Sequence, residues 1–577
     1  MNAVFKFYRT HGPPHWRWYL AGVVTLLCTN FLSVRIPVYL GRAIDVIKVG
    51  GDNVQADVSF YAGVIAAMGV GIIVVRTLSR VAFFTPGRLV EAEVKRNLFA
   101  KLLRQQLPFH QTYPAGDLIS RSSSDVGYVR LLAGFGAFGI VNTGIALVMA
   151  IAQMTEINAF LAAVTMVPVV LALLSVRVFI KRMFRLVHKM QKELAQLSDH
   201  VLSTYQGIAT VKSFAAEEAF AERFDVTNRD YLRTSEQRAD MRAIIGPILA
   251  FAATLNVFVL LYFGGPMAIR NEISVGELVA FIALTGFLAG PIRGASFLLS
   301  VFKQAEAALQ RIDEVADPLP ERPDLPNPVA VPTSCPELRV EHLTFAYPDA
   351  PDVPVLHDIQ LVVPPGTTLG IMGATGSGKT TLVRMLTRLF NPPAGTVFVD
   401  GIDIRSLDLD GWRQSLAVVP QRAFLFSESV RDNILLGAPD DGRLEQVLTT
   451  TTMDVDIAAL PQGTETLVGE AGVMLSGGQR QRTALARGLV RDHTLLVLDD
   501  VLSAVDHKTE HQLIAAMRSG GPSTSIIVTN RISAIQHADQ IIMLEDGAIV
   551  QRGDHASLVL EEGLYRDIWE RQSDSAA

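Results

Sequence analysis

Eight residues in the second half of the chain have the composition of a phosphate-binding loop. Gly373 to Thr380 read GATGSGKT, which satisfies the pattern G-x4-G-K-[ST]. The backbone N–H groups of such a loop surround phosphate oxygens, and the helix that follows adds partial positive charge. Lys379 would reach the β and γ phosphates of a nucleotide, and the Thr380 hydroxyl would bind Mg²⁺. The loop residues expected to bind nucleotide are Gly373, Ala374, Thr375, Gly376, Ser377, Gly378, Lys379, Thr380 and Thr381.

Further polar residues follow two apolar runs near the C-terminus. Asp499 ends the run LLVL, so its carboxylate would lie at the edge of a sheet, where Mg²⁺ would bind. Asp500 comes directly after it, and Asn530 ends the run SIIVTN. These positions are candidates for the chemistry of phosphate hydrolysis.

An α/β domain is expected to position these groups. Strand-like runs such as GTTLGIMGA and QIIMLEDGAIV alternate with helical runs between residues 337 and 577, which predicts a largely parallel sheet flanked by helices. The phosphate loop lies between a strand-like and a helical run, as it must. Before this domain, residues 313–336 are so rich in proline that they indicate a linker.

The first part of the chain, residues 1–312, has the character of a membrane domain. Of the 577 residues, 49% are hydrophobic and the mean hydropathy is +0.30, which is too apolar for an ordinary soluble enzyme. Six apolar runs reach the roughly 20 residues that a bilayer requires. They cover Trp18–Ile44, Val58–Phe84, Leu131–Ala152, Ala159–Ile180, Ile244–Phe263 and Val275–Phe302.

The segments between these runs predict an orientation and two long extensions. Lys6, Arg9 and Arg17 precede the first run, which places both termini in the cytoplasm if six helices cross. A cleaved signal peptide is disfavoured, because the run lacks a small-residue cleavage site and is long enough to span. Residues 180–242 have helical periodicity and would extend about 45 Å out and back as two arms.

Composition disfavours several other classes of protein. The net charge of -6 and the lack of long basic runs give no reason to expect nucleic acid as a partner. Cys28 and Cys335, the two cysteines, cannot form a disulfide framework or a thiol metal cluster.

Residues Leu475 to Val490, LSGGQRQRTALARGLV, carry a family resemblance. Together with the phosphate loop they resemble the ATP-binding cassette family, and especially its exporter half-transporters. The resemblance implies an α-helical membrane domain of six transmembrane helices with long cytoplasmic extensions, followed by an α/β P-loop nucleotide-binding domain. It also implies that the signature residues face ATP bound on the opposite subunit; these are Leu475, Ser476, Gly477, Gly478 and Gln479.

The resemblance implies roles for other positions. Tyr347 resembles the aromatic residue that stacks on adenine, and Gln421 resembles the glutamine that contacts Mg²⁺ and the attacking water. Thr466–Gly472 resembles a segment that touches the partner's cytoplasmic rods, and Ser503–Asp506 the loop that crosses between two nucleotide sites. TYPAGDLISRSSSDV and GIATVKSFAAEEAF resemble the coupling regions of the membrane domain.

Two positions depart from the family pattern. The family usually has Glu where this chain has Asp500, and His where it has Asn530. Asp is shorter by one methylene, and Asn cannot carry a proton or a positive charge. Both changes fall on the same ATP site, whereas the signature belongs to the other. We therefore expect one half of a heterodimer, whose non-identical partner supplies the catalytic Glu and His; a slow homodimer and a nucleotide-gated channel or regulatory subunit are the alternatives.

The transported substrate is indicated only by class. Arg76, Arg80 and Arg293 lie near the inner interface of the predicted spans, either to snorkel to lipid headgroups or to favour anionic amphiphiles. The resemblance implies ATP-driven export of a small or amphipathic drug, lipid or peptide, and the length of the chain suggests a bacterial plasma membrane.

Overall fold

The computed structural model describes residues 2–316, 328–331, 335–469, 473–501 and 523–574. They form two compact units: Met1–Leu102 with Gly116–Asp317, and Leu103–Ala115 with Pro318–Ala577. Each unit is described by itself below.

The first unit is helical, and all six predicted apolar runs lie in its helices. Its elements are α1 (Asn2–His11), η1 (Pro13–His15), α2 (Trp16–Val49), α3 (Val54–Leu103), α5 (Ala115–Ser120), η2 (Arg121–Asp125), α6 (Val126–Leu131), η3 (Leu132–Gly136), α7 (Ala137–Ile157), α8 (Ala159–Gln206), α9 (Ile208–Ser213), α10 (Glu217–Ile269) and α11 (Val275–Ala316).

Four stretches in the described part of the chain are long and apolar enough to cross a membrane. They are Pro13–Val49, Val54–Leu103, Ala115–Ile157 and Ala250–Ile269. Two shorter apolar stretches, Ala159–Leu171 and Val275–Leu288, belong to α8 and α11. Arg76 and Arg80 are exposed on α3, and the side chain of Arg293 lies outside the described part.

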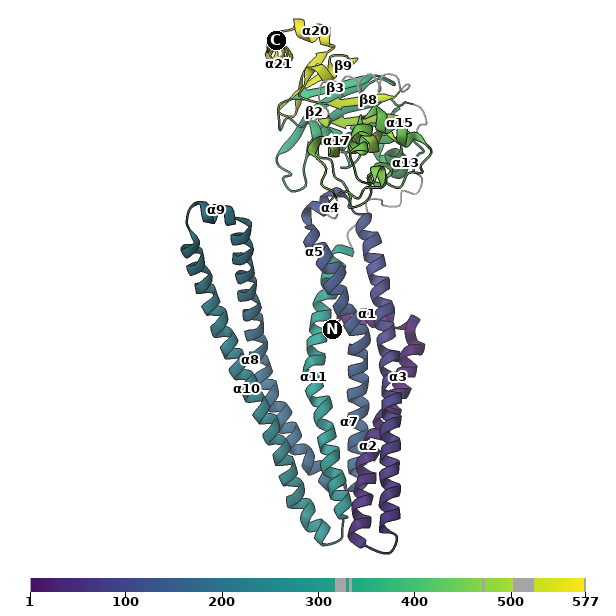
Figure 1. The fold of residues 1–577 in the computed structure, drawn as a ribbon, viewed down its shortest axis with the longest axis vertical. Helices are drawn as coiled ribbons and strands as arrows, with labels where there is room; N and C mark the ends of the chain where they lie inside the picture. Colours follow the sequence, from purple (N-terminus) through teal and green to yellow (C-terminus); the bar gives the residue numbers. More distant parts are fainter. Residues whose placement is uncertain (1, 317–327, 332–334, 470–472, 502–522, 575–577) are drawn as a thin grey trace. The chain divides into compact units, whose positions relative to one another are not determined.

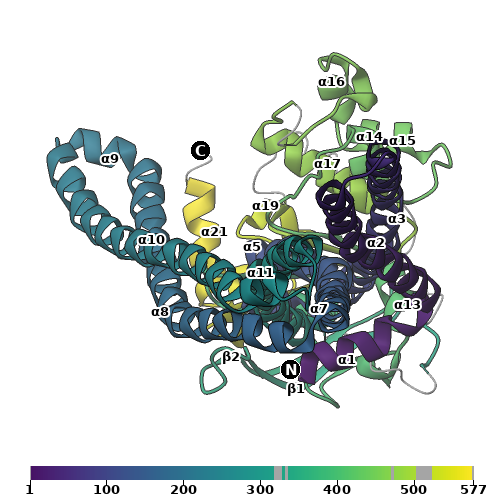
Figure 2. The ribbon, with the colours of Figure 1, turned by 90° about the horizontal axis from the view of Figure 1, so that it is seen from below.

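The three longest helices in the described part of the chain far exceed the length that a bilayer needs. α3 has 50 residues, α8 has 48 and α10 has 53, so each is roughly 70–80 Å long. α8 and α10 run side by side, and α9 joins them at one end, as both views show (Figures 1 and 2). The predicted out-and-back arms are thus helices, and the chain turns between Gln206 and Glu217.

α2 and α11 approach each other closely at one end of the first unit. A Cβ atom on Gly276 would lie 2.0 Å from the carbonyl oxygen of Gly41, so no side chain fits there. The Asp45 carboxylate accepts hydrogen bonds from the Ser274 hydroxyl at 2.6 Å and from the Gly276 N–H at 2.7 Å. Because the first N–H groups of a helix lack intrahelical acceptors, Asp45 caps α11 from a neighbouring helix.

The third predicted span, Leu131–Ala152, and the segment before it do not form a uniform α-helix. Leu132–Gly136 and Arg121–Asp125 are π-helical turns, η3 and η2. The carbonyl of Leu132 accepts a hydrogen bond from Tyr8 Oη at 2.6 Å, and that of Ala133 accepts one from Tyr19 Oη at 2.9 Å. These hydroxyls satisfy carbonyls where the helical hydrogen-bond pattern changes.

The described residues of the second unit form two sheets. The larger has the strand order β10-β9-β3-β8-β7-β6, in which only the pairing of β10 with β9 is antiparallel. The smaller is antiparallel, with the order β2-β1-β4-β5. The strands are β1 (Leu338–Ala346), β2 (Pro354–Val363), β3 (Thr368–Gly373), β4 (Val397–Val399), β5 (Ile402–Asp403), β6 (Leu416–Val419), β7 (Leu495–Asp499), β8 (Thr524–Val528), β9 (Gln540–Glu545) and β10 (Ala548–Gly553).

Helices surround these sheets, as the alternating pattern predicted. They are α4 (Leu107–Thr112), α12 (Lys379–Leu386), η4 (Ile404–Ser406), α13 (Leu409–Gln414), α14 (Val430–Leu435), α15 (Arg443–Thr450), α16 (Met453–Ala458), η5 (Gly463–Glu465), α17 (Gly477–Leu489), α19 (Ile532–Ile535), α20 (His555–Leu560) and α21 (Leu564–Asp574).

The largest core of the second unit includes side chains from both sheets and from α12, with Trp412 fully buried. Leu107 of α4 packs against this core, and the whole segment Leu103–Ala115 belongs to the second unit, although the chain before Leu103 and from Gly116 to Asp317 belongs to the first.

Candidate functional site

The phosphate loop connects β3 to α12 in a conformation that requires glycine. Gly373 has φ +155° and Gly378 has φ +97°, in the region that side chains rarely adopt. A Cβ on Gly373 would lie 2.1 Å from the carbonyl oxygen of Leu544, and one on Gly378 would lie 2.9 Å from Leu356 Cδ2. The two glycines of the pattern G-x4-G-K-[ST] are therefore required both by their backbone conformation and by the lack of room for a side chain.

Lys379 is the first residue of α12 and folds back over the loop. Its Nζ donates hydrogen bonds to the carbonyl oxygens of Gly373 and Ala374, each at 2.8 Å. Burial lowers the pKa of Lys379, while the carboxylates of Asp500 and Asp499 favour its charged form. This places an ammonium group inside a loop built for phosphate.

Asp499 and Thr380 bring oxygen atoms together at the end of β7. The Thr380 hydroxyl donates to Asp499 Oδ2 at 3.0 Å, and the Asp499 side chain is buried. Burial raises the pKa of Asp499, although the Thr380 hydrogen bond opposes this shift. A nearby cation stabilises the charged form of a desolvated carboxylate, and Mg²⁺ prefers oxygen ligands. The Asp499 carboxylate, the Thr380 hydroxyl and the amide oxygen of Gln421 are three such ligands, so the chemistry of this set fits Mg²⁺.

Asp500 lies on a strained backbone. Its φ is +52°, a left-handed conformation that Asp tolerates better than most residues with a side chain. Its N–H donates to the carbonyl of Val528 at 2.8 Å, and its Oδ2 accepts a hydrogen bond from Gln421 Nε2 at 3.1 Å. Asp500 thus contacts the glutamine that the sequence resemblance assigned to Mg²⁺ and water.

Asn530 follows β8 and is exposed. The loop that carries it is fixed by Gln572 of α21, whose Nε2 donates to the Asn530 carbonyl at 2.8 Å and whose Oε1 accepts from the Ile532 N–H at 3.0 Å. No local motif marks Gln572, so sequence reasoning missed it.

One cavity of about 270 Å³ gathers most of the predicted nucleotide residues. Val355, at the start of β2, is a lining residue that the sequence did not indicate, because no motif surrounds it. The lining residues are Val355, Thr375, Gly376, Gly378, Lys379, Thr380, Thr381, Gln421, Asp499, Asp500 and Asn530.

Tyr347 lies beside this cavity through its hydroxyl group. The hydroxyls of Tyr347 and Thr381 are 2.9 Å apart, and Arg384 Nη1 donates to Tyr347 Oη at 3.1 Å. The Tyr347 ring meets Phe390 edge to face, with centroids 5.3 Å apart. Its position beside Thr381 is compatible with the predicted contact to a nucleobase.

The signature residues do not line this cavity. Ser476 is the N-cap of α17 and forms a capping box with Gln479: Ser476 Oγ accepts from the Gln479 N–H at 3.2 Å, and Gln479 Oε1 accepts from the Ser476 N–H at 2.8 Å. Such a helix start suits anion binding.

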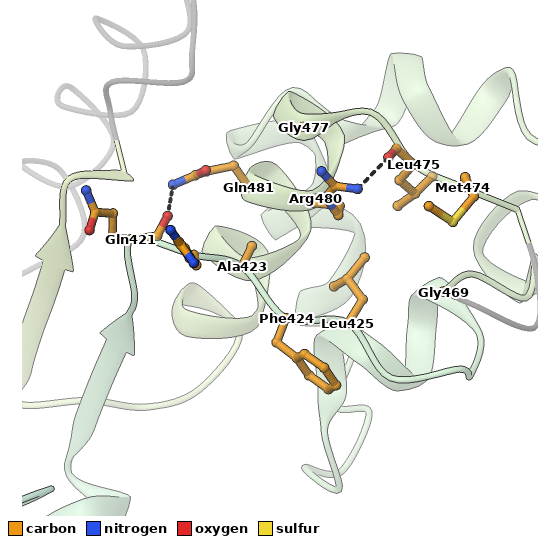
Figure 3. Close-up of a pocket in the computed structure, with 11 residues that line it drawn as sticks. Gln421, Ala423, Phe424, Leu425, Gly469, Met474, Leu475, Gly477, Arg480 and Gln481 are labelled. Carbon is orange, nitrogen blue, oxygen red and sulfur yellow. Dashed lines mark hydrogen bonds between the residues drawn. The ribbon is translucent and has the colours of Figure 1, made fainter. Parts of the chain in front are cut away.

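Leu475 and Gly477 line a second cavity of about 470 Å³ (Figure 3). Phe424, Met474 and Arg480 line it as well. Gln421 lines both cavities, and its carbonyl accepts a hydrogen bond from Gln481 Nε2 at 3.4 Å in the second. Two predicted segments, residues 470–472 of Thr466–Gly472 and all of Ser503–Asp506, lie outside the described residues.

Comparison with known proteins agrees with this geometry. A family model described as "ABC transporter transmembrane region" matches residues 19–292, and one described as "ABC transporter" matches residues 356–503. A probable multidrug resistance ABC transporter ATP-binding/permease protein of Bacillus subtilis is 31% identical over 99% of this chain and 98% of its own. An ATP-dependent lipid A-core flippase of Methylococcus capsulatus is 30% identical, covering 99% and 95%.

Among solved structures, a bacterial Atm1-family ABC exporter with ATP bound matches with a TM-score of 0.80 and 25% identity. The match covers 98% of both chains.

Proposed function

Because this chain belongs to the ATP-binding cassette transporter family and has the fold of its exporters, we propose that it is one half of a heterodimeric exporter with two unequal ATP sites. In this proposal its own phosphate loop, with Asp499, Asp500 and Asn530, forms a site that hydrolyses ATP weakly. Its intact signature completes a competent site on a non-identical partner, which supplies the Glu and His that this chain lacks.

One observation carries the proposal: the two departures share a cavity with the phosphate loop. Asp500 and Asn530 line the same cavity as Lys379 and Asp499. The signature, by contrast, begins α17 outside that cavity. Both altered positions therefore fall on one nucleotide site. In this proposal the intact signature acts at the other site, which supports unequal sites more than a general loss of function in the nucleotide-binding domain.

The geometry of Asp500 explains why its own site would be slow. The carboxylate is one methylene shorter than Glu and already accepts a hydrogen bond from Gln421. An error of about 1 Å in placing a catalytic group can cost roughly 10²-fold in rate. Asn530 can donate a hydrogen bond to the γ-phosphate but cannot supply a proton.

Binding of ATP is retained in this proposal. The loop amides and Lys379 would hold the phosphates, and Tyr347 would contact the adenine. Thr380, Asp499 and Gln421 would hold Mg²⁺, whose charge offsets that of the phosphates. Hydrolysis at the competent site would return the membrane domain to inward access.

The substrate and location follow by analogy with relatives. One relative is named for multidrug resistance and another for a lipid A-core flippase. We propose a small or amphipathic substrate of the drug, lipid or peptide class, and a bacterial inner membrane with both termini in the cytoplasm, as the basic residues before α2 favour.

Purification of the tagged chain from its native membrane, followed by mass spectrometry, tests the proposal. We expect a second half-transporter in equal amount, with Glu and His at the positions that match Asp500 and Asn530. Recovery of this chain alone, as a homodimer that hydrolyses ATP, would overturn it.

A further inference from the structure

Asp456 of α16 contacts the signature helix at two points. Its Oδ1 accepts a hydrogen bond from Gln479 Nε2 at 3.2 Å. Its Oδ2 accepts from Arg482 Nε at 2.9 Å and from Arg482 Nη2 at 2.6 Å. The side chains of Asp456 and Arg482 are only 17% and 18% exposed. This ion pair is therefore largely shielded from water. Shielding strengthens the attraction between the two charges, which holds both side chains in place.

The contact with Asp456 determines which way the Gln479 amide points. A side-chain amide accepts at its oxygen and donates at its nitrogen. Gln479 uses the oxygen for the Ser476 N–H and the nitrogen for Asp456. Turning the amide over would set two donors against each other at Ser476. An acceptor at position 456 thus keeps the capping box closed.

The closed capping box leaves particular donors for an anion. It engages the backbone N–H groups of Ser476 and Gln479. By helix geometry, the N–H groups of Gly477 and Gly478 have no acceptor within α17. These two amides, with the Ser476 hydroxyl, are the groups that the signature can offer to a phosphate, and their directions depend on the shape of the cap.

We propose that Asp456 is a positioning residue that holds the signature loop, through Gln479, in the shape that completes the nucleotide site of the opposite subunit. This inference rests on the proposed function, in which this signature acts at a partner's site. Arg482 compensates the charge of Asp456, so that the carboxylate does not repel the phosphate.

The test is Asp456→Ala in this chain, measured on the complete transporter purified from the membrane. We expect kcat for ATP hydrolysis to fall about 10-fold, because misdirected donors weaken transition-state contacts. The KM for ATP should change by less than about twofold, since the phosphate loop that binds the nucleotide is untouched. Unchanged kcat would overturn the proposal.

Two further variants separate positioning from folding. Asp454→Ala removes an exposed carboxylate from the same helix and should leave kcat unchanged. The exchange Asp456→Arg with Arg482→Asp can restore an ion pair, but it places a donor where Gln479 needs an acceptor. We expect this exchange to recover thermal stability without recovering kcat. Recovery of both would show that the ion pair alone matters, and the proposal would be wrong.

The result remains informative if the transporter is a homodimer. Subunit composition is measured by mass spectrometry on the same preparations. In a homodimer Asp456 would occupy both sites, so a fall in kcat at constant KM would support positioning while rejecting the heterodimer. In a heterodimer, unchanged kcat would reject positioning and leave the unequal sites standing.

Discussion

Asp500 has a left-handed backbone conformation, and its carboxylate accepts a hydrogen bond from another side chain. Its φ of +52° directs the short carboxylate to Gln421, which donates to it at 3.1 Å. In most members of the family a longer Glu at this position acts on water. Here the shorter carboxylate accepts a hydrogen bond from another residue of the protein, Gln421. In the proposed mechanism this contact accompanies weak hydrolysis at the site.

We expect Asp500→Ala in this chain to change transport by less than about twofold, since its site already hydrolyses weakly in the proposed mechanism. Ser476→Ala should reduce transport about 10-fold or more, because it removes both a cap and a hydroxyl offered to the partner's nucleotide. Substrate flux into membrane vesicles measures both.

Equal amounts of assembled transporter, judged by gel filtration, are the control for this comparison. The reverse order of the two variants would contradict the assignment of Asp500 to a weak site and Ser476 to a competent one.

The nucleotide residues were predictable because they are consecutive or directly follow apolar strands. The phosphate loop needs only eight neighbouring residues, and Asp499 ends a run of four apolar ones. Val355, Asp456 and Gln572 were not predictable. Asp456 reaches Gln479 across 23 positions, and Gln572 reaches Asn530 across 42, so only the tertiary fold brings them together.

Helices α2 and α11 are joined by close packing and by the Asp45 cap. Gly41 and Gly276 allow the two backbones to touch, and Asp45 accepts a hydrogen bond from the Gly276 N–H in the first turn of α11. Small residues at such crossings are a common means of helix association in membranes. Packing and capping depend on each other here, because the Gly276 N–H is itself a donor to Asp45.

We expect Gly276→Ala to destabilise the membrane unit by about 1–3 kcal/mol, since its methyl group would overlap the Gly41 carbonyl. Thermal unfolding in detergent measures the loss. Gly286→Ala on the same helix is the matched control, because a Cβ there meets no atom within 4 Å. Similar melting temperatures for the two variants would contradict this packing argument.

Hydropathy predicted the membrane helices well because each apolar run has the number of residues that a helix needs to cross a bilayer. It could not reveal the π-helical turns η2 and η3. A π-turn differs from an α-turn in its hydrogen-bond spacing, and the hydropathy of the segment is the same in both. Nor could it assign α4. Leu107–Thr112 has no pattern of its own, and it groups with the second unit because Leu107 packs against that unit's core.

The polypeptide passes between the two units at three points. Besides the segment at Asp317 and Pro318, it passes from Leu102 to Leu103 and returns from Ala115 to Gly116. α4 therefore belongs to the second unit while α3 and α5, on either side of it, begin or end in the first. We expect movement of the second unit to be transmitted to both helices through covalent bonds.

We expect Leu107→Ala to lower the amount of substrate moved per ATP hydrolysed by several-fold, because losing a partly buried leucine loosens α4 from its unit at a cost of about 1–2 kcal/mol. Parallel measurements of ATPase activity and transport in proteoliposomes give this ratio.

Leu103→Ala is the control for coupling, since Leu103 is 68% exposed. An unchanged ratio in the Leu107 variant would show that α4 does not transmit the movement.

The grouping of α4 with the second unit also determines which fragments of the protein can be separated by proteolysis or produced by truncated expression. A cut within the proline-rich segment breaks one of three connections, and the N-terminal fragment keeps a helix that belongs to the other unit's fold. We therefore expect the two fragments to copurify after such a cut. A cassette produced from residue 337 onward would lack α4, leaving bare the apolar surface that Leu107 covers and favouring aggregation.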